Sequence, residues 1–235
     1  MTAELRSFSV EIDTDRWRGT VLRDVNLTVP AGQITAVLGG PGDGKTMIAY
    51  ALTGRLPGTA HSTGSVVIDG SVGYVPQEGV DAFAPDRTVG AQLQELQQLH
   101  GGWTVEQACA AAYYPPDAAT LLPAHNSAGQ IQRAAIAAAL LAAPDVLVAD
   151  GPTSSLDQGT AHAVWKSLRE YADSGAALLV ITHDVGLLAA TGYAERVIIV
   201  SEGQILATGT PAELASSEDP RVNMYFRAFG VRPTT

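Results

Sequence analysis

The stretch "GGPGDGKT", residues Gly39 to Thr46, decides which fold this chain can adopt. It fits the pattern G-x-x-x-x-G-K-[ST], in which glycines let successive backbone N–H groups curl around phosphate oxygens. The apolar run "QITAVLGG" (33–40) precedes it and the helix-like run "KTMIAYALTGRL" follows it, which is the context the motif requires. The helix start adds a positive partial charge, Lys45 can reach the β- and γ-phosphates, and Thr46 can ligate Mg²⁺. We therefore predict a phosphate-binding loop (P-loop).

One residue of this loop does not suit an anion site. Asp43 places a carboxylate among amides that are expected to bind phosphate. Two interpretations are open at this point. Asp43 is either an ordinary solvated turn residue or a residue that faces the nucleotide.

A second motif is the run "DVLVAD", residues 145–150, which reads as a buried strand ending in an acid. Such a strand, about a hundred residues after a P-loop, typically carries the aspartate that holds Mg²⁺, here Asp150. A second carboxylate directly after it would be needed to polarise a water molecule. That position holds Gly151.

Composition limits the size, partners and compartment of the protein. The chain has 235 residues, 46% of them apolar, so it can form one large domain with a sizeable core. Its 24 acids and 14 bases give a net charge of −10, and an acidic surface repels phosphate backbones, so we expect no nucleic acid partner. Cys109 is the single cysteine, which excludes an internal disulfide and fits a reducing compartment. Its helix-like surroundings favour an inert core residue over a nucleophile.

The sequence contains neither an apolar leader nor a membrane span that we can recognise. The first residues, "MTAELRSFSVEIDTDRWRG", lack the apolar core of a secretory signal. The longest apolar stretch, Ala134 to Ala143, is too short to cross a bilayer. We expect the chain to meet a membrane only through a partner.

The order of apolar and helix-like segments indicates an α/β fold. Apolar runs at 33–40, 145–150 and 176–184 alternate with helix-like stretches near 131–143 and 159–174, which predicts a mainly parallel sheet covered on both faces. The run "RVIIVSEGQILATGT" predicts a hairpin that turns at Glu202-Gly203. The stretch from about residue 79 to 125 is mostly helix-like, and we interpret it as a helical insert.

The stretch "NSAGQIQRAAIAAALLAAPDVLVAD" resembles the ATP-binding cassette (ABC) ATPases. In that family, amides at the start of the helix after the signature motif bind the γ-phosphate of ATP held by the opposite subunit, which is the physics of a helix N-terminus. The resemblance implies a P-loop NTPase fold with an antiparallel β subdomain and a small helical subdomain. Its signature positions are Ser127, Ala128, Gly129 and Gln130, followed by Arg133 on the helix.

Further motifs resemble the family in the family's order. "YVPQE" places Gln77 at the Q-loop position, which contacts Mg²⁺ and the attacking water. "SSLD" places Asp157 at the D-loop position of the dimer seam, and "VITHD" places His183 at the switch position near the γ-phosphate. Trp17 stands where an aromatic ring stacks on adenine, although core packing is a rival interpretation. The implied magnesium ligands are Thr46, Gln77 and Asp150, and the implied ATP-binding residues are Trp17, Gly39, Gly40, Pro41, Gly42, Asp43, Gly44, Lys45 and Thr46.

The family usually has a glutamate directly after the aspartate of its Walker B strand, which is Asp150 here. That glutamate acts as general base. Gly151 stands there, and general base catalysis contributes about 10²–10⁴-fold to rate. We expect this chain to bind ATP, to hydrolyse it poorly in its own pocket, and to pair with a different ATPase that carries the glutamate. A rival hypothesis is that Asp43 or Glu78 supplies the missing carboxylate.

Several stretches, including "LTGRLPGTAHSTGSVVIDG" and "RTVGAQL", resemble the nickel and di- or oligopeptide importer ATPases. The resemblance implies one ABC ATPase domain over residues 1–235, with a helical insert at about 79–130 and a C-terminal tail at about 211–235. Implied partners are a second ATPase, permease subunits and, indirectly, a solute-binding protein, with the chain at the cytoplasmic face of the membrane. The aromatic residues of the insert could line the permease groove or pack in the core: Phe83, Trp103, Tyr113 and Tyr114. Alternative functions are an exporter ATPase, a non-hydrolysing regulatory ATP sensor and a non-transport ABC protein.

Overall fold

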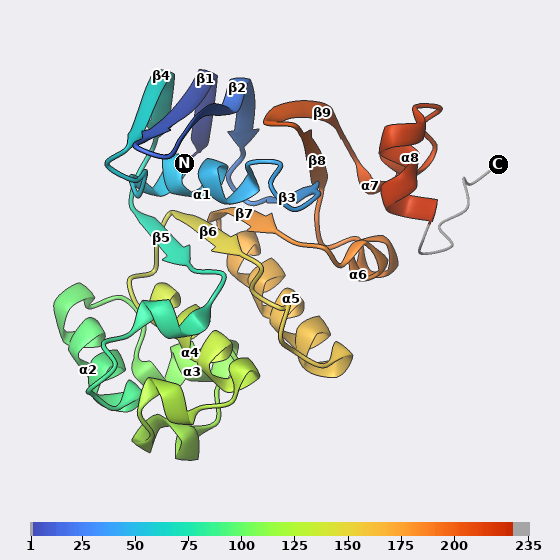
Figure 1. The fold of residues 1–235 in the computed structure, drawn as a ribbon. Helices are drawn as coiled ribbons and strands as arrows, with labels where there is room; N and C mark the ends of the chain where they lie inside the picture. The colour runs from blue at the N-terminus through green and yellow to red at the C-terminus, as the bar shows by residue number, and fades with distance from the viewer. Residues whose placement is uncertain (1, 228–235) are drawn as a thin grey trace.

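The computed structural model describes residues 2–227 and contains a six-stranded sheet at its centre (Figure 1). Five of its strands pair in parallel and the sixth, at the edge, is antiparallel to its neighbour. This arrangement confirms the predicted α/β fold with a mainly parallel sheet. In spatial order the strands are β5 (Val72–Val75), β6 (Val146–Asp150), β7 (Ala177–Ile181), β3 (Ile34–Gly39), β8 (Arg196–Ser201) and β9 (Gln204–Gly209).

A second, antiparallel sheet covers one side of the molecule. Its strands lie in the order β2 (Trp17–Val29), β1 (Ala3–Thr14) and β4 (Ala60–Ile68). Helix α1 (Lys45–Thr53) lies between this sheet and the central sheet (Figure 1). The small sheet is the antiparallel β subdomain that the resemblance implied.

Side chains of the central strands alternate between two apolar clusters, as the two-residue period of a strand requires. In β6, Val146 and Val148 pack with α1 and the small sheet, whereas Leu147 and Ala149 pack with the helices of the other face. All five residues of β6 are buried. A strand covered on both faces must be apolar throughout, which explains the unbroken run that the sequence shows.

Helices cover the other face of the central sheet and form a separate group below it in Figure 1. Two helices were predicted near residues 131 and 159. Side-chain caps at Ser127 and Asp157 set their actual starts, at residues 128 and 158. Residues 228–235 of the predicted tail lie outside the described residues. The helices are η1 (Gly79–Ala82), α2 (Val89–His100), α3 (Val105–Ala111), η2 (Pro116–Thr120), η3 (Pro123–His125), α4 (Ala128–Leu140), α5 (Gln158–Asp173), α6 (Val185–Thr191), α7 (Pro211–Ala215) and α8 (Pro220–Arg227).

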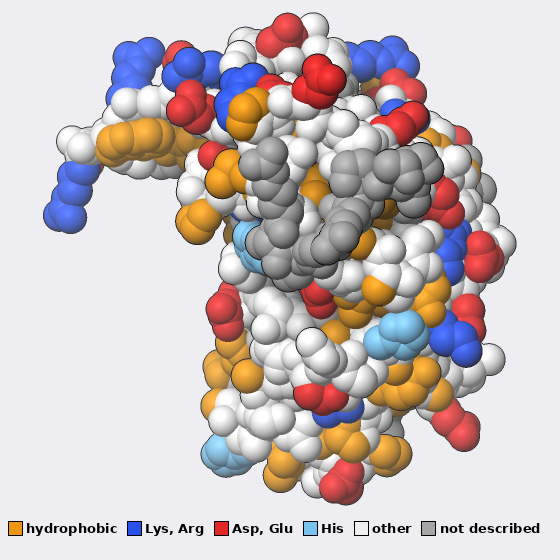
Figure 2. All heavy atoms as spheres, turned by 90° about the vertical axis from the view of Figure 1, so that its right-hand side faces the viewer, with side chains coloured by type: hydrophobic (Ala, Val, Ile, Leu, Met, Phe, Trp, Pro, Cys, Tyr) orange, Lys and Arg blue, Asp and Glu red, His pale blue; other side chains and the backbone are white. Residues whose placement is uncertain are grey.

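Basic side chains on the surface lie among acidic ones. Figure 2 shows one face, on which Lys and Arg side chains are interspersed with Asp and Glu side chains. Several arginines are ion-paired: Arg87 with Glu95 at 2.7 Å and Arg221 with Asp219 at 2.9 Å, for example.

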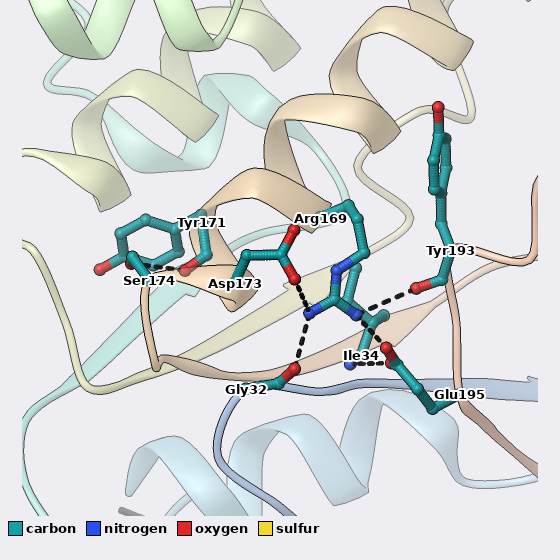
Figure 3. A network of polar contacts seen from close by, with 8 residues as sticks. All are labelled: Gly32, Ile34, Arg169, Tyr171, Asp173, Ser174, Tyr193 and Glu195. Carbon is teal, nitrogen blue, oxygen red and sulfur yellow. Dashed lines mark hydrogen bonds and ion pairs between the residues drawn. The ribbon is translucent and has the colours of Figure 1, made fainter.

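A buried arginine ties three segments together at the edge of the sheet where β3 begins (Figure 3). Arg169 of α5 donates to the carbonyl oxygens of Gly32 (2.6 Å) and Tyr193 (3.3 Å) and is ion-paired with Glu195 and with Asp173 (3.0 Å). Glu195 in turn accepts from the backbone N–H of Ile34 at 2.8 Å. This network fixes α5 against the entrances to β3 and β8.

Candidate functional site

The P-loop connects β3 to α1 and depends on glycine at defined points. Gly42 and Gly44 have φ values of 83° and 93°, a region that side chains disfavour. A Cβ atom at Gly39 would lie 2.6 Å from the carbonyl oxygen of Val200, so the loop also needs glycine for close approach. No side chain caps the start of α1, which leaves its first amides to bind an anion.

Lys45 is held across this loop. Its Nζ donates to the carbonyl oxygens of Gly39 (3.0 Å) and Gly40 (2.6 Å), and the residue is only 8% exposed. Burial lowers the pKa of Lys45, while the charges of Asp43 and Asp150 act in the opposite direction. A nearly buried ammonium group with carbonyl partners that a phosphate can replace suits the predicted role.

Thr46 and Asp150 come together although they are far apart in the sequence. Thr46 Oγ1 donates to Asp150 Oδ2 at 2.7 Å, and Asp150 is 3% exposed. Burial raises the pKa of Asp150, and the Thr46 hydrogen bond, Lys45 and His183 oppose this effect. A hydroxyl and a carboxylate side by side fit Mg²⁺, which binds oxygen ligands and completes its shell with water and phosphate.

His183 lies at the same edge of the sheet. It follows β7 directly, is exposed, and is near enough to Asp150 to lower the pKa of that carboxyl group. The carboxyl ends of β3, β6 and β7 thus bring the P-loop, Asp150 and His183 to one place. This is where ligands bind in open α/β sheets.

Asp43 is half-buried and contacts two segments of the protein. Its Oδ2 accepts from the Gly40 N–H at 2.6 Å and its Oδ1 accepts from the Glu202 N–H at 3.0 Å. The Gly203 N–H also donates to its carbonyl oxygen, at 3.2 Å. Asp43 therefore braces the P-loop against the turn between β8 and β9, and both carboxylate oxygens are engaged.

Gly151 follows β6 and points toward the Q-loop. Its φ is 58°, and a Cβ atom there would lie 3.8 Å from Gln77 Cγ and 3.5 Å from Ser154 Oγ, both ordinary contacts. Gln77 is exposed and lines a groove together with Thr46 and Glu78. A side chain at position 151 would have room beside Gln77, and glycine supplies no carboxylate there.

Trp17 is the first residue of β2 and is 54% exposed, so it does not pack in the core. Its ring lies against Gly19, because a Cβ atom at Gly19 would be 2.5 Å from the indole. An exposed indole held against its own strand is available for stacking.

The signature residues form the start of α4. The Ser127 hydroxyl accepts from the Gln130 N–H at 3.2 Å, and the Gln130 side chain accepts from the Ser127 N–H at 2.8 Å, which makes a capping box. Ser127 and Ala128 are exposed. Arg133, one turn further along α4, donates to the carbonyl oxygen of Gly129 at 3.1 Å. This bond holds the signature residues at the start of the helix.

The D-loop lies directly beside the signature residues. Ser155 Oγ donates to the carbonyl oxygen of Ala128 at 3.4 Å, and a Cβ atom at Gly129 would be 3.1 Å from Leu156 Cδ2. Asp157 caps α5 by accepting from the Thr160 N–H at 3.0 Å, which lowers the pKa of Asp157. The two motifs therefore form one surface.

Sequence reasoning missed Gln132, which connects the Q-loop to the signature helix. Gln132 is 2% exposed, and its Nε2 donates to the carbonyl oxygen of Pro76, directly before Gln77, at 3.0 Å. At Gly79 a Cβ atom would be 2.6 Å from the carbonyl oxygen of Ile131, so the segments touch. A lone amide on the apolar face of a helix is the signal that could have indicated it.

The aromatic residues of the insert differ in exposure. Phe83 and Tyr114 are buried in the core, and Trp103 packs edge-on against Tyr171 with ring centres 5.5 Å apart. Tyr113 is 46% exposed. Cys109 is half-buried, and burial raises its pKa to about 11, as expected for an inert thiol.

A groove of about 810 Å³ runs from Thr46, at the end of the P-loop, to helices α2 and α4. Alanines of α4 and Leu96 of α2 form its apolar wall. On the opposite wall, Tyr74 packs edge-on against Tyr50 at 6.1 Å, and the Arg55 guanidinium lies 5.1 Å from the Tyr74 ring centre.

Within residues 2–227, no helix is both long and apolar enough to cross a membrane.

The α/β fold and the P-loop between β3 and α1 define a P-loop nucleotide-binding protein. The family model "ABC transporter" matches residues 22–154, and the chain belongs to the ABC transporter family as an ATP-binding subunit. It is 28% identical over 238 residues to the oligopeptide transport ATP-binding protein OppD of Haemophilus influenzae, covering 90% of this chain and 73% of that protein.

Two further comparisons agree with this assignment. The chain is 33% identical over 207 residues to the zinc import ATP-binding protein ZnuC of a Jannaschia species, covering 86% of this chain and 81% of that protein. Its fold is similar to a dimeric ATP-binding cassette solved in a post-hydrolysis state with ADP and phosphate. For that pair the TM-score is 0.78 at 22% identity, with 89% of this chain and 98% of that chain covered.

Proposed function

We propose that this chain is the ATP-binding subunit of an importer in which its own pocket binds ATP but hydrolyses it slowly. The observation that carries this proposal is Gly151, which faces Gln77 where a general base would stand. ATPases of this family work as dimers with permeases. A chain with an impaired pocket is useful in a heterodimer whose other member carries the glutamate.

ATP binding in this pocket rests on groups that this chain retains. The loop amides and Lys45 hold the phosphates, Thr46 and Asp150 hold Mg²⁺ with Gln77, and Trp17 stacks on adenine. Mg²⁺ held there would neutralise the negative charge that develops on the phosphate groups. The His183 side chain contacts the γ-phosphate. Position 151 itself offers no carboxylate to take the proton of an attacking water.

The signature surface completes the pocket of the other subunit. Ser127 and Ala128 are exposed at the start of α4, where the amides and helix dipole can bind a γ-phosphate presented by a partner. Asp157 lies at the seam beside them. ATP then joins the two subunits, because each γ-phosphate contacts both of them.

The groove between the P-loop side and the helical segment is the proposed permease site. Its apolar wall of alanines and its Gln77 end suit an amphipathic helix of the permease. Closure of the dimer moves the helical insert, at about 79–130 of a single domain spanning 1–235, and Gln132 transmits this movement to the Q-loop. The subunit then lies at the cytoplasmic face of the membrane. Relatives named for oligopeptide and zinc import favour import of a solute delivered by a binding protein.

ATPase activity of the purified chain tests the proposal. We expect slow turnover by the wild type and at least a tenfold increase in Gly151→Glu. The increase should fall short of the full 10²–10⁴-fold effect of a general base, because a side chain at a φ of 58° costs about 1–2 kcal/mol. Gly151→Gln is the control, since it carries the same strain without a base and should stay slow. Brisk turnover by the wild-type chain alone would contradict the proposal.

The rival hypothesis of a substitute carboxylate now concerns Glu78 more than Asp43. Both oxygens of Asp43 accept hydrogen bonds from backbone amides, whereas Glu78 is exposed in the groove that contains Thr46 and Gln77. Glu78→Gln should abolish the residual hydrolysis if this hypothesis holds. Unchanged hydrolysis would exclude it.

A second candidate function is a regulatory ATP sensor, which Gly151 also favours. A sensor would close as a dimer on ATP without any permease. Copurification of a permease and a second ATPase would distinguish the transporter from the sensor.

A further inference from the structure

Asp43 closes the first half of the P-loop on itself. Its Oδ2 accepts from the Gly40 N–H at 2.6 Å, while its own N–H donates to the Gly40 carbonyl oxygen at 3.3 Å. These two bonds hold residues 40–43 as a turn, in which Gly42 has the left-handed φ of 83°. Lys45 Nζ also donates to the Gly40 carbonyl oxygen. The shape of the phosphate-binding segment therefore depends on where the Asp43 carboxylate lies.

The other carboxylate oxygen attaches the P-loop to the turn between β8 and β9. The Glu202 N–H donates to Asp43 Oδ1 at 3.0 Å, and the Gly203 N–H donates to the Asp43 carbonyl oxygen at 3.2 Å. Both turn residues have positive φ values, 51° and 77°, and they connect the paired residues Ser201 and Gln204. This is the pattern of a tight two-residue hairpin turn. Both N–H groups of that turn are thus directed at one residue of the P-loop.

The same turn packs against β2, and so does the P-loop. The Gly203 carbonyl oxygen accepts from the Arg23 N–H at 2.9 Å, and a Cβ atom at Gly203 would lie 2.2 Å from the carbonyl oxygen of Val21. A Cβ atom at Gly44 would lie 2.9 Å from that same oxygen. The P-loop, the turn and β2 therefore meet at Val21, and β9 runs beside β2 (Figure 1). Trp17, the residue proposed to stack on adenine, begins β2.

The N–H groups of Gly40 and Glu202 need two acceptor oxygens, which the Asp43 carboxylate supplies. An asparagine side chain has one oxygen, and its NH₂ group would face one of the two donors. We propose that Asp43 is a positioning residue that clamps the P-loop, through the β8–β9 turn, to the strand β2 that carries Trp17. The two ends of ATP then bind to one connected unit. This inference rests on the proposed binding of ATP at the P-loop.

Asp43→Asn separates the clamp from simple electrostatics, because the two effects have opposite signs. Loss of a negative charge beside a triphosphate would by itself tighten binding, whereas loss of the clamp weakens it. We expect the affinity for a non-hydrolysable ATP analogue with Mg²⁺ to fall about tenfold, the effect of one hydrogen bond to a charged group. Titration calorimetry of the full-length protein measures this affinity. Equal or tighter binding by Asp43→Asn would overturn the inference.

Glu202→Gln is the matched control for this substitution. It removes a negative charge from the same turn but keeps the backbone N–H that donates to Asp43, so its affinity should not fall. A loss equal to that of Asp43→Asn would overturn the inference, because charge in this region would then explain both results.

A double-mutant cycle with Trp17→Ala tests whether the clamp connects the two ends of ATP. Losses of affinity at independent sites add. If the clamp holds β2 in place, the loss caused by Trp17→Ala should be at least about threefold smaller in the Asp43→Asn background than in the wild type. Additive losses would overturn the inference.

Two further variants keep the test decisive. Asp43→Ser also lacks the charge and the second oxygen, so it replaces Asp43→Asn if circular dichroism shows that variant to be unfolded, and its affinity should fall in the same way. Lys45→Ala distinguishes the two proposals. If it loses ATP binding while Asp43→Asn keeps wild-type affinity, the clamp alone is refuted. If it retains ATP binding, the P-loop site itself is refuted.

Discussion

At the residue scale, the burial of Asp150, a proposed Mg²⁺ ligand, has a cost to stability. Burial raises its pKa, so the folded chain binds a proton at this group more readily than the unfolded chain does. A group of this kind stabilises the fold less as pH rises above the unfolded pKa, because the buried carboxylate must then carry its charge. In the proposed function, charge at this position is needed only when Mg²⁺ and ATP bind.

We therefore predict that Asp150→Asn melts higher than the wild type in the absence of nucleotide. An increase of about 2–4 °C at about pH 7 corresponds to about 1 kcal/mol in a chain of this length. The difference should be smaller at about pH 4 than at about pH 7, because acid protonates the carboxyl group whose pKa burial raises. Calorimetry at both pH values measures it, and Mg²⁺-dependent ATP binding should be lost in the same variant. A lower melting temperature at both pH values would contradict this explanation.

The residues of the P-loop could be predicted because their roles follow from local backbone geometry. Lys45 and Thr46 open a helix directly after a glycine loop, and Asp150 ends a buried strand. The role of Asp43 could not be predicted, because its partner Glu202 is 159 positions away and donates through its backbone. Any residue except proline can donate through its backbone N–H, so the residue type at position 202 does not indicate this contact.

At the element scale, Ser127 caps α4 at the end of the helix that is proposed to bind a phosphate. The Ser127 hydroxyl caps the helix, while the amides that follow are proposed to bind the partner's γ-phosphate. Ser127→Ala should lower the free energy of unfolding by about 0.5–2 kcal/mol, because one orphan amide loses its partner. Urea denaturation measures the loss. Ser127→Thr keeps the cap and should remain near the wild type, and equal losses in both variants would contradict a capping role.

The first two strands show where periodicity fails as a guide. Strands β1 and β2 are 12 and 13 residues long, yet the sequence pattern did not reveal their bounds. Their pairing shifts register three times, and Ser7 and Asp24 take positive φ values of 44° and 47°. Each bulge reverses which side chains face inward, so the alternation breaks. The buried strands of the central sheet have no such interruption.

At the scale of the whole molecule, Arg169 connects segments from both halves of the chain. Its side chain is 12% exposed and bonds to Gly32, Tyr193 and Glu195 (Figure 3). Arg169→Met should lower the free energy of unfolding by about 1–3 kcal/mol, because it leaves two partly buried carbonyl groups without this donor. Lys166→Met is the control: its ion pair with Glu170 is exposed and should contribute less than about 1 kcal/mol. Equal effects of the two substitutions in urea denaturation would exclude this role for Arg169.

The general arrangement of the molecule followed from motif order, since strands ending in the P-loop, Asp150 and His183 must share one edge of a parallel sheet. The network around Arg169 did not, because two of its acceptors are backbone carbonyls from distant segments. Contacts of this kind depend on the folded chain and are invisible in any short stretch.

Strands β5 and β6 are immediate neighbours, with Val72 paired to Val146, yet the long segment between them contains helices and loops and belongs to neither sheet. The chain departs from the sheet and rejoins it at adjacent points. Such an excursion can be lengthened, shortened or exchanged while the strand pairing stays as it is. The stretch between Gln77 and Ser127 can therefore change the surface that it offers to a proposed partner, while the proposed nucleotide contacts at its two ends stay in place.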